Sequence, residues 1–525
     1  MSRGGIAVAP NADAARAAAA VLGEGGDAIE AMVAAAATIA VVYPHMNGIG
    51  GDAFWLVHEP GRAPRAIDAC GPAGMRVDAA FYGERGLAAI PVRGPLAANT
   101  VAGTVGGWNL ALAHSRAAWG GRLPLARLLA PAIEYAERGI RVTKSQEAST
   151  AAKLVELAHQ PGFGGRFLPG GKVPAEGESF VQRPMGAALH RLAEAGLDDL
   201  YRGDLARSIA SELADAGSPL GLADLEAYRA EWREPLSLDH SRGMLFNMTP
   251  PTQGVVSLMI LGILDRLGPP AAESADYVHA VVEATKQAFG VRDRHVTDPR
   301  YMSVHPQSLL ASGALAALAG AIDPTRAKPW GTRTAAGDTV WMGVIDAAGR
   351  AVSFIQSIYH EFGSGIVLPS TGVNWQNRGC SFALDPAARN ALVPGRKPFH
   401  TLNPAMALLA DGRTMVYGTM GGDGQPQTQA AVFTRHVVHG MPLQEAVSAP
   451  RWLLGRTWGS MSESLKLESR FDPALVEELA RRGHDVEVVA AFDEVVGHAG
   501  ALVRHPDGRL DGGYDPRSDG ALARP

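Results

Sequence analysis

The sequence changes character at Thr339, and this change constrains the fold more than any other feature of the chain. From Thr339 onward, short runs rich in β-branched and aromatic residues alternate with the turn sequences AAGR and DGR. The runs predict strands joined as hairpins at residues 339–346, 351–359, 404–410 and 414–420. Residues 324–338, just before them, are rich in Pro, Gly, Thr and Ala and lack periodicity, which predicts an exposed loop. Thr339 therefore stands where a loop enters a sheet.

The first two thirds of the chain are predicted to be mainly helical, with Gly/Pro turns and a few strands. Asp27 can cap a helix over residues 28–42, whose alanine-rich surface would allow close packing against a sheet. Apolar residues at helical spacing predict another helix over residues 275–294. The C-terminal part is expected to form hairpins followed by helices at residues 427–438 and 473–482. The chain thus combines helices and strands.

Length and composition limit the kind of protein. The chain has 525 residues, more than the roughly 250 to 300 that one core usually supports, so two domains or one large layered body are expected. Hydrophobic residues make up 46% and charged residues 19%, which indicates a globular protein with a large core. A net charge of -5 with scattered basic residues argues against nucleic acid and anionic membranes as partners. A small molecule is the expected ligand.

Targeting and membrane signals are weak. The N-terminal segment carries Asp13, Arg16 and Glu24 where a secretory signal would need an uninterrupted apolar stretch. The longest later apolar run begins at Ala31 and covers about 14 residues, too few for a membrane-spanning helix. We therefore expect a soluble, cytoplasmic protein.

Several short motifs have ordinary structural explanations. The GIGGD sequence at Gly48 lacks the lysine of a phosphate-binding loop, so a turn, or a loop where the backbone approaches a ligand, is favoured. His436 and His439 form an H-x-x-H pair without the glutamate of a zinc protease. Cys70 and Cys380 are too few for a disulfide scaffold and lack zinc spacing, which predicts buried thiols. We expect no metal and no cofactor.

A threonine at the head of a strand has two readings. Threonine is β-branched, so Thr339 can be an ordinary strand residue. Threonine is also a strong nucleophile when it is the N-terminal residue, because its own α-amine can accept the hydroxyl proton. An internal threonine reaches that state only if the chain is cut before it. A loop ending in Gly337 and Asp338, followed by a rigid strand, suits such self-cleavage.

Eight blocks, in order and nearly end to end, resemble the γ-glutamyltranspeptidase family of N-terminal-nucleophile hydrolases. In chain order they are GGDAIEAMVAAAATIAVVYPHMNGIGGDAF, ANTVAGTVGGWNLAL, TPPTQGVVSLMILGIL, VEATKQAFGVRDRHVTDP, TVWMGVIDAAGRAVSFIQSIYHEFGSGIV, KPFHTLNPAM, MGGDGQPQTQ and YDPRSDGAL. The resemblance implies an α+β fold, a four-layer αββα sandwich. It also implies self-cleavage into a large subunit, residues 1–338, and a small subunit, residues 339–525, which share one core. The two fragments would form a heterodimer, with a dimer of heterodimers as a further assembly.

The resemblance also implies roles for individual residues. Cleavage would fall between Asp338 and Thr339, making Thr339 both the new N-terminus and the nucleophile. Ser357 matches the hydroxyl residue that hydrogen-bonds the nucleophile in the family. Gly421 and Gly422 match the paired glycines whose backbone amides bind the oxyanion, although a plain turn is an alternative for them.

The chain departs from the family where glutamate would be held. Cys70 stands near the position of the arginine that clamps the α-carboxylate, and Ser381 replaces the aspartate that takes the α-ammonium group. His400 and Thr401 replace a serine pair, and Tyr359 replaces an asparagine. Losing both the guanidinium and its balancing carboxylate removes the charge-assisted contacts to an amino-acid head group. Glutathione therefore becomes an unfavoured substrate.

The pattern is similar to the branch of the family that includes oxamate amidohydrolase. In that setting Arg378 is a candidate anchor for a small carboxylate, with a surface arginine as the alternative, and Tyr359, His400 and Thr401 are candidate substrate contacts. The expected activity is hydrolysis of the C–N bond of a small acid amide through a threonyl acyl-enzyme. Two alternatives stay open: a γ-glutamyl transferase or glutathione hydrolase, and an unprocessed, non-catalytic binding protein with the same fold.

Overall fold

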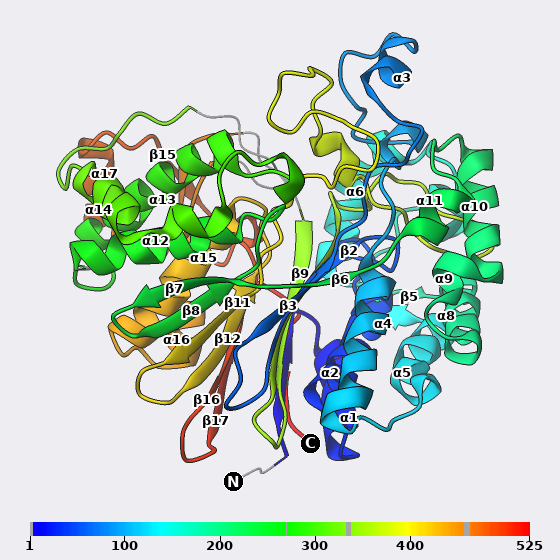
Figure 1. The fold of residues 1–525 in the computed structure, drawn as a ribbon, viewed down its shortest axis with the longest axis horizontal. Helices are drawn as coiled ribbons and strands as arrows, with labels where there is room; N and C mark the ends of the chain where they lie inside the picture. The colour runs from blue at the N-terminus through cyan, green and yellow to red at the C-terminus, as the bar shows by residue number, and fades with distance from the viewer. Residues whose placement is uncertain (1–3, 269, 332–337, 456–461) are drawn as a thin grey trace.

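The computed structural model describes residues 4–268, 270–331, 338–455 and 462–525, and at its centre two antiparallel sheets face each other (Figure 1). The first sheet has seven strands in the order β18-β1-β9-β10-β2-β3-β6, and the second has six in the order β17-β16-β12-β11-β8-β7. The first comprises β1 (Ile6–Ala9), β2 (Asp52–His58), β3 (Arg65–Ala69), β6 (Glu231–Arg233), β9 (Asp338–Ile345), β10 (Ala351–Tyr359) and β18 (Ala521–Ala523). The second comprises β7 (Leu236–His240), β8 (Gly243–Asn247), β11 (Ala405–Leu409), β12 (Thr414–Thr419), β16 (Ala499–Arg504) and β17 (Leu510–Tyr514).

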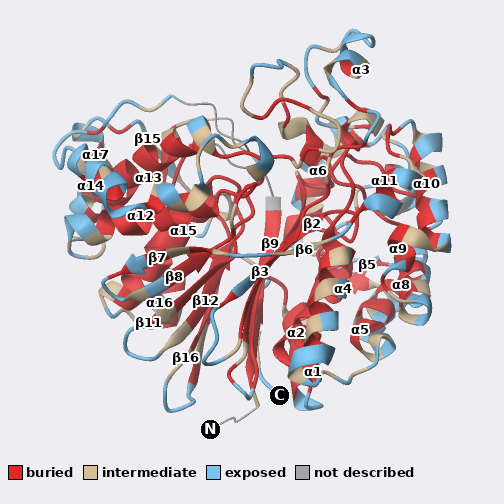
Figure 2. Cartoon of the chain, viewed as in Figure 1, coloured by how far each residue is buried: buried red, intermediate tan, exposed pale blue. Residues whose placement is uncertain are grey.

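Helices cover the outer face of each sheet, which gives four layers in the order α, β, β, α and confirms the expected fold class (Figure 1). The layer beside the first sheet includes α1 (Ala12–Gly23), α2 (Ala28–Val42), α4 (Thr104–His114), α5 (Leu125–Arg138) and α8 (Arg183–Ala195). The layer beside the second includes α12 (Gly254–Leu267), α13 (Ala275–His295), α14 (Ser312–Gly320), α15 (Gly424–Phe433), α16 (Leu443–Ser448) and α17 (Pro473–Arg481). Burial follows the layers, because strands and inner helix faces are buried while outer helix faces are exposed (Figure 2).

Smaller elements surround this sandwich. The further helices are α3 (Ala79–Gly83), α6 (Lys144–Leu157), α7 (Phe163–Phe167), α9 (Asp199–Arg202), α10 (Asp204–Ala216) and α11 (Leu222–Ala227). Two small sheets pair β4 (Ile140–Arg141) with β5 (Ser179–Phe180), and β13 (Trp452–Leu454) with β14 (Leu465–Glu468) and β15 (Val486–Val489). Among the described helices, none combines the length and the apolar character needed to cross a bilayer.

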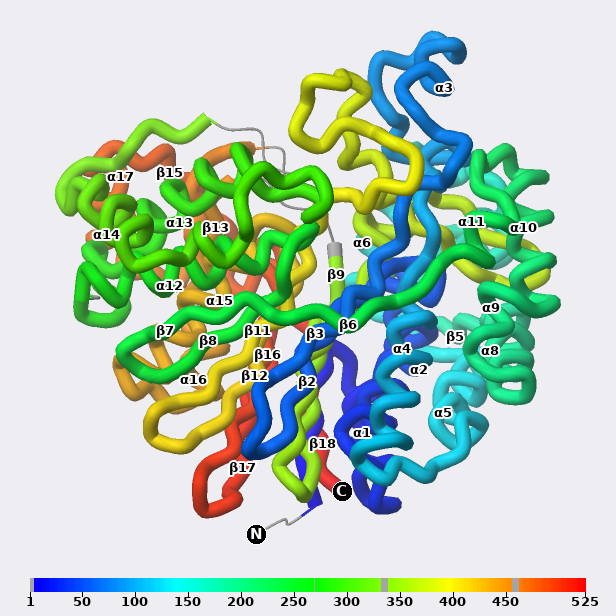
Figure 3. The backbone as a smooth tube through the Cα atoms, viewed as in Figure 1, coloured from blue at the N-terminus to red at the C-terminus, as the bar shows by residue number. Residues whose placement is uncertain are grey.

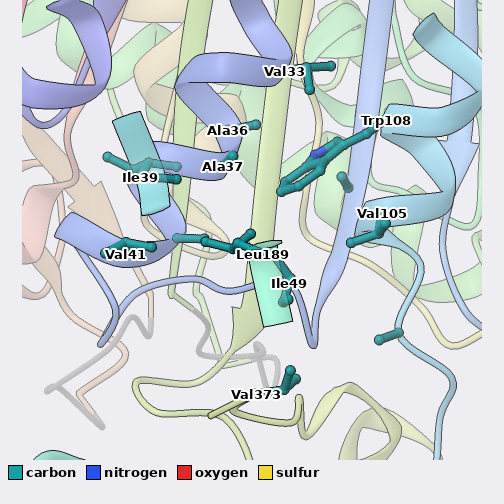
Figure 4. Close-up of a cluster of buried hydrophobic side chains, with 14 of the residues drawn as sticks. Val33, Ala36, Ala37, Ile39, Val41, Ile49, Val105, Trp108, Leu189 and Val373 are labelled. Carbon is teal, nitrogen blue, oxygen red and sulfur yellow. The ribbon is translucent and has the colours of Figure 1, made fainter. Parts of the chain in front are cut away.

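Helix α2 shows why the alanine-rich stretch packs as it does. Asp27 Oδ1 accepts the backbone N–H groups of Ile29 and Glu30, and Glu30 Oε2 accepts that of Asp27, a capping box that defines the start of the helix. Every residue of the helix is buried. Its small side chains let it lie close to the first sheet and to Trp108 of α4 (Figure 4). The predicted bounds of this helix are confirmed.

The two sheets meet at Trp341 of β9. Its indole lies against two strands of the second sheet, where a Cβ on Gly418 would come within 2.2 Å of the ring and one on Gly500 within 2.6 Å. Only glycine leaves that space. Trp341 Nε1 also donates to Ser353 Oγ at 3.0 Å, so the one polar atom of the indole is satisfied inside the core.

The predicted strands after Thr339 and the helices at residues 275–294 and 473–482 agree with the structure to within about two residues. The helix predicted at residues 427–438 begins earlier, at Gly424, and ends in a π-helical turn. The expectation that the chain finishes in helices was incomplete, because β16, β17 and β18 follow and complete both sheets. The first two of these strands contain glycines, which weaken a strand signal in the sequence but are required here by close packing.

Both sheets contain strands from before and after residue 338. In the first sheet β9, β10 and β18 lie beside β1, β2, β3 and β6, and in the second β11, β12, β16 and β17 lie beside β7 and β8. The chain crosses between the sheets in the segment from β6 to β7 (Figure 3). Cutting the chain at residue 338 would therefore leave neither part with a complete sheet. Within the loop predicted before Thr339, residues 332–337, which include Gly337, lie outside the described residues.

Candidate active site

Thr339 is the second residue of β9 and is buried, with 1% of its surface exposed. Trp341 and Ile345 of the same strand point into the core between the sheets, while Val340 and Met342 point toward the helices. Side chains alternate along a strand, so Thr339 lies on the inner face, toward the second sheet. The loop-to-strand junction thus directs this hydroxyl into the sandwich rather than into solvent.

A β-bulge lies directly opposite Thr339. In the β9–β10 pairing Gln356 is level with Val340 and Tyr359 with Asp338, so Ser357 and its neighbour Ile358 share the single position facing Thr339. Ser357 Oγ accepts the backbone N–H of Tyr359 at 2.8 Å, which stabilises the bulge. Bulges re-aim side chains and are frequent beside active sites. The two hydroxyl residues singled out in the sequence are therefore neighbours across one strand pair.

Tyr359 ends β10 in an unusual backbone conformation. Its φ is +82°, a value that costs an L-residue about 1 to 3 kcal/mol and is found mainly at functional sites. The ring is buried, and the guanidinium carbon of Arg378 lies 3.9 Å from its centre. Burial is the main cause that raises the pKa of the phenol, and the nearby carboxylate of Asp423 adds to the rise. Tyr359 thus connects β10 to two other segments of the site.

Arg378 is completely buried, so the alternative of a surface arginine is wrong. Its Nε donates to the carbonyl oxygen of Phe399 at 2.8 Å. Nη1 and Nη2 are also buried and have no hydrogen-bond partner among the described residues. Burial lowers the pKa of the guanidinium. A buried cation with two unused donors is costly, and an anion that accepts both hydrogen bonds would relieve that cost.

His400 and Thr401 are both buried, and His400 lies beside a carboxylate. His400 Nε2 is 3.1 Å from Asp52 Oδ2, and burial lowers the pKa of the imidazole well below its usual value, so the ring is neutral. Burial raises the pKa of Asp52 to about 7. Thr401 Oγ1 has no hydrogen-bond partner among the described residues. These polar atoms are available to a ligand.

The two departures from the family pattern lie near the same place. Cys70 is buried beside Asp52 and His400, and burial raises the pKa of its thiol. Ser381 is half-buried, and its Oγ donates to the carbonyl oxygen of Phe399 at 3.4 Å, the same acceptor that Arg378 uses. Neither residue could supply a charge equivalent to the arginine or aspartate that it replaces.

Gly421 and Gly422 form a turn at the N-terminus of α15. Their φ angles are +115° and +53°, a region that favours glycine. Their carbonyl oxygens are used, by the N–H of Gly424 at 2.7 Å and by Nε2 of Gln253 at 2.9 Å. Their own N–H groups have no acceptor among the described residues. Two free amides at the positive end of a helix suit an anion or a developing oxyanion.

Packing between the sheets brings this turn to the level of Thr339. Trp341 of β9 lies against Gly418 of β12, and a Cβ on Gly343 of β9 would lie 3.3 Å from Val416 of β12. Because the residue number rises along β9 while it falls along β12, the two strands run past each other in opposite directions. Continuing this alignment by two residues puts Thr339 level with Met420, next to Gly421. We infer that the threonine hydroxyl and the free amides lie at the same end of the sandwich.

Sequence reasoning missed the residues that hold these segments together. Gln253 Nε2 donates to the carbonyl oxygens of Gly422 at 2.9 Å and Thr401 at 3.0 Å, and its Oε1 accepts from Arg292 Nη1 at 2.9 Å. Arg292 also forms an ion pair with Asp423 at 2.7 Å. The sequence signal for these residues was their polarity within buried helices. They lie in the TPPTQG sequence at the start of one helix and in the VRDRH sequence inside another.

The other motifs are structural. Gly51 of the GIGGD turn lies against β10, since a Cβ there would come 2.1 Å from the carbonyl oxygen of Ser357. His436 contacts Arg413 and the carbonyl oxygen of Met441, and it belongs to neither group of metal-capable side chains in the described residues.

A pocket of about 310 Å³ is lined by Gly162, Gly165, Arg166, Val181, Gln182, Pro184, Met185, Val367, Leu368, Pro369 and Gly372. It contains none of the candidate residues.

Several known proteins resemble this chain over nearly its whole length. The profile of the family described as Gamma-glutamyltranspeptidase matches residues 14–524. The chain is 59% identical over 524 residues to the oxamate amidohydrolase proenzyme of Klebsiella pneumoniae, covering 100% of this chain and 99% of that protein. It is 41% identical over 523 residues to the glutathione hydrolase-like YwrD proenzyme of Bacillus subtilis, covering 98% and 97%. The crystal structure of cephalosporin acylase from Bacillus halodurans superposes with a TM-score of 0.91 at 33% identity, covering 100% of this chain and 96% of that one.

Proposed function

The chain belongs to the gamma-glutamyltranspeptidase family of N-terminal-nucleophile hydrolases, and we propose that it is a self-processing amidohydrolase acting on a small acid amide such as oxamate. The observation that carries the substrate class is the buried guanidinium of Arg378, whose Nη1 and Nη2 lack partners among the described residues. One carboxylate would satisfy both donors in the bidentate geometry that arginine favours. The name of the Klebsiella relative supports the same class.

Self-processing comes first in the proposed sequence. The hydroxyl of Thr339 attacks the carbonyl carbon of Asp338, and the peptide bond between these residues breaks, which leaves an ester and the free α-amine of Thr339. Hydrolysis of the ester by water then gives residues 1–338 and 339–525 as two fragments. The names of the relatives, which describe proenzymes, support this step. The fragments stay together as a heterodimer because each contributes strands to both sheets. A dimer of heterodimers is a further possible assembly within this proposal.

Catalysis then proceeds by acyl transfer. The Thr339 hydroxyl attacks the amide carbonyl while its proton passes to the α-amine of the same residue. The amides of Gly421 and Gly422 donate hydrogen bonds to the oxyanion, and Ser357 holds the nucleophile in place. Collapse of the intermediate breaks the C–N bond, and the leaving ammonia or amine takes up the proton. Water then attacks the threonyl ester and releases the acid.

The remaining contacts define a short pocket. The carboxylate lies on Arg378 above the ring of Tyr359, and the neutral imidazole of His400 and the hydroxyl of Thr401 hydrogen-bond the rest of the substrate. Among the described residues, Arg378 is the candidate anchor and neither Cys70 nor Ser381 supplies a second charged clamp, which favours a compact monoanion. An amino-acid head group also carries an ammonium group. In the family an aspartate binds that group, but Ser381 stands at its position here, so the ammonium group would lack this carboxylate.

The test is a panel assay of released ammonia or amine from purified protein. Oxamate should be turned over far more efficiently than γ-glutamyl anilide or glutathione. Glutathione hydrolysis is the second candidate, favoured by the 41% identical relative whose name is glutathione hydrolase-like. If glutathione is hydrolysed as efficiently as oxamate, the acid amide assignment is wrong. A single band on a denaturing gel that persists on incubation, with no turnover of any amide, would instead support a non-catalytic binding protein.

A further inference from the structure

Two groups of metal-capable side chains occur in the described residues, and they differ in how their donor atoms are used. The first is His279, Glu283 and His484. Here His279 hydrogen-bonds His484 at 2.8 Å and the carbonyl oxygen of Asp323 at 2.8 Å. Glu283 accepts from Lys286 at 2.6 Å and from the N–H of Lys328 at 3.2 Å. All of these donors are occupied, so this group is a hydrogen-bond network that holds the segment at residues 323–328.

The second group is Asp52, Cys70 and His400, and each of these residues keeps at least one ligand atom without a strong hydrogen bond among the described residues. The three residues are fully buried, and one ligand atom from each lies within 4.8 Å of the others. Asp52 Oδ2 and both ring nitrogens of His400 lack a hydrogen-bond partner within the part of the chain that the structure describes. The Cys70 thiol makes only a weak contact with the carbonyl oxygen of Gly71 at 3.7 Å. Buried polar atoms without partners are rare and call for an explanation.

The geometry between Asp52 and His400 indicates what these atoms are aimed at. Nε2 and Oδ2 are 3.1 Å apart, close enough for a hydrogen bond, yet they are not aligned as one. Two ligands about 2.0 to 2.1 Å from one tetrahedral zinc ion lie about 3.3 Å apart. The spacing is compatible with both arrangements, and the poor alignment favours two ligands that point toward a common ion.

The protein also holds Asp52 in a fixed orientation. Asp52 Oδ1 accepts from the N–H groups of Gly71 at 2.9 Å and Gly103 at 3.0 Å, and from Gln376 Nε2 at 3.1 Å. These three hydrogen bonds leave only Oδ2 available. Outer hydrogen bonds of this kind orient the ligands in metal sites and raise their affinity.

We propose that Asp52, Cys70 and His400 bind a divalent transition metal of the zinc class, with a fourth position left for water or a ligand. Carboxylate, thiolate and imidazole are the donor types that such ions prefer, and three protein ligands with an open position are typical of reactive zinc sites. Binding releases the thiol proton of Cys70 to solvent, so the thiolate and the carboxylate together balance the two positive charges.

The surrounding charges limit the affinity. Lys397 forms an ion pair with Asp68 at 2.7 Å, so its charge is offset. Arg378 is not offset, and it lies close enough to shift the pKa values of Cys70 and His400. We therefore expect binding at micromolar rather than picomolar concentrations. A metal held by His400 would also displace the acid amide from its pocket, and this consequence rests on the proposed function whereas metal binding does not.

Cobalt binding tests the site directly, because a cobalt–thiolate bond gives a charge-transfer absorption band. The chain has only 2 cysteines, so Cys380→Ser is a matched control for Cys70→Ser. Wild type and Cys380→Ser should show the band, and calorimetry should give one Zn²⁺ per heterodimer. Cys70→Ser should lose the band and bind Zn²⁺ at least about 10-fold more weakly. A wild type without the band, or a band that survives in Cys70→Ser, overturns the proposal.

Two further variants keep the result unambiguous. Cys70→Ala replaces Cys70→Ser if thermal melting shows that the serine variant is misfolded. Thr339→Ala removes the N-terminal amine and hydroxyl, which also chelate metals, and it should keep the cobalt band. Zinc should inhibit oxamate hydrolysis by wild type and Cys380→Ser, and not by Cys70→Ser or Cys70→Ala. If zinc inhibits wild type and Cys70→Ser equally, the metal site does not block the substrate pocket. If the protein shows the cobalt band but hydrolyses no amide, the proposed function is wrong and the metal site stands.

Discussion

The guanidinium carbon of Arg378 lies 3.9 Å from the centre of the Tyr359 ring, and Tyr359 directly follows the bulge that faces Thr339. The candidate nucleophile and the candidate carboxylate anchor are therefore linked through one strand end. Tyr359 adopts its φ of +82° at this link, where the chain turns out of β10. Within the proposed function, this link favours substrates whose carbonyl lies close to their carboxylate.

The first prediction concerns Thr339. Thr339→Ala should remain a single chain and lose all hydrolysis, since neither the hydroxyl nor a new α-amine exists. Thr339→Ser should process more slowly but stay active, because it keeps the hydroxyl. Mass spectrometry of the processed wild type should give threonine at the new N-terminus. A different N-terminus would remove the basis for the nucleophile assignment.

The second prediction concerns Arg378. A desolvated bidentate contact to a carboxylate contributes on the order of 1.5 to 3 kcal/mol, so Arg378→Ala should lower kcat/KM for oxamate by about 10- to 150-fold. Self-cleavage should be unaffected, because it involves no bound carboxylate. Arg138→Ala, which removes an exposed guanidinium, serves as the control and should not change the kinetics. Unchanged kinetics in Arg378→Ala on every acidic substrate would show that this arginine is a bystander.

The third prediction separates the ring of Tyr359 from its hydroxyl. Tyr359→Phe should keep kcat and KM within about 2-fold, because the ring contact with Arg378 remains. Tyr359→Gly suits the positive φ but removes the ring, so KM for oxamate should rise by about 2- to 30-fold, the equivalent of a cation–π contact. Steady-state kinetics of both variants distinguish a role of the ring from a role of the hydroxyl. A large loss in Tyr359→Phe would mean that the hydroxyl itself contacts the substrate.

The fourth prediction concerns the oxyanion amides. A Cβ on Gly421 would lie 3.4 Å from Gly497, so an alanine has room, but a φ of +115° is unsuitable for it. Gly421→Ala should therefore reorient the N–H and lower kcat by about 10²- to 10³-fold. Gly508→Ala is a matched control with a φ of +84° and open space around it. It should lower the melting temperature without changing kcat, and a similar kcat loss in both variants would indicate a general effect on folding.

The fifth prediction is a pH dependence of stability. Glu494 is half-buried beside Ser145, whose Oγ donates to its carboxyl at 3.0 Å, and partial burial raises the pKa of Glu494 to about 7. The unfolded chain loses this proton at about pH 4.3, so ionising this carboxyl costs stability as the pH rises from there past 7. Glu494→Gln avoids that cost and keeps an acceptor for Ser145.

The variant should therefore be more stable than wild type by about 1 to 2 kcal/mol at pH 8, a value reduced for partial exposure, and no more stable at pH 4. Thermal melts of the processed protein across this range provide the measurement, with the exposed Glu226→Gln as control. A stability gain that is equal at both pH values would exclude ionisation of Glu494 as its cause.

The sequence by itself determined the elements whose signals are local. Asp27 as a helix cap predicts where α2 begins, and the short β-rich runs after Thr339 predict β9 to β12 closely. Ordered motifs then identified the family and, with it, the candidate nucleophile. These inferences work because a helix start, a strand alternation or a motif depends on residues close together in the chain.

Only the tertiary structure decided the contacts that depend on distant residues. It buries Arg378 without a carboxylate partner among the described residues, and it brings Asp52 and Cys70 beside His400. It also adds the glycine-containing strands β16 and β17 to the second sheet, where Gly500 of β16 makes room for Trp341. Burial and strand register arise from packing between segments far apart in the chain, and no local pattern encodes which segment a residue will meet.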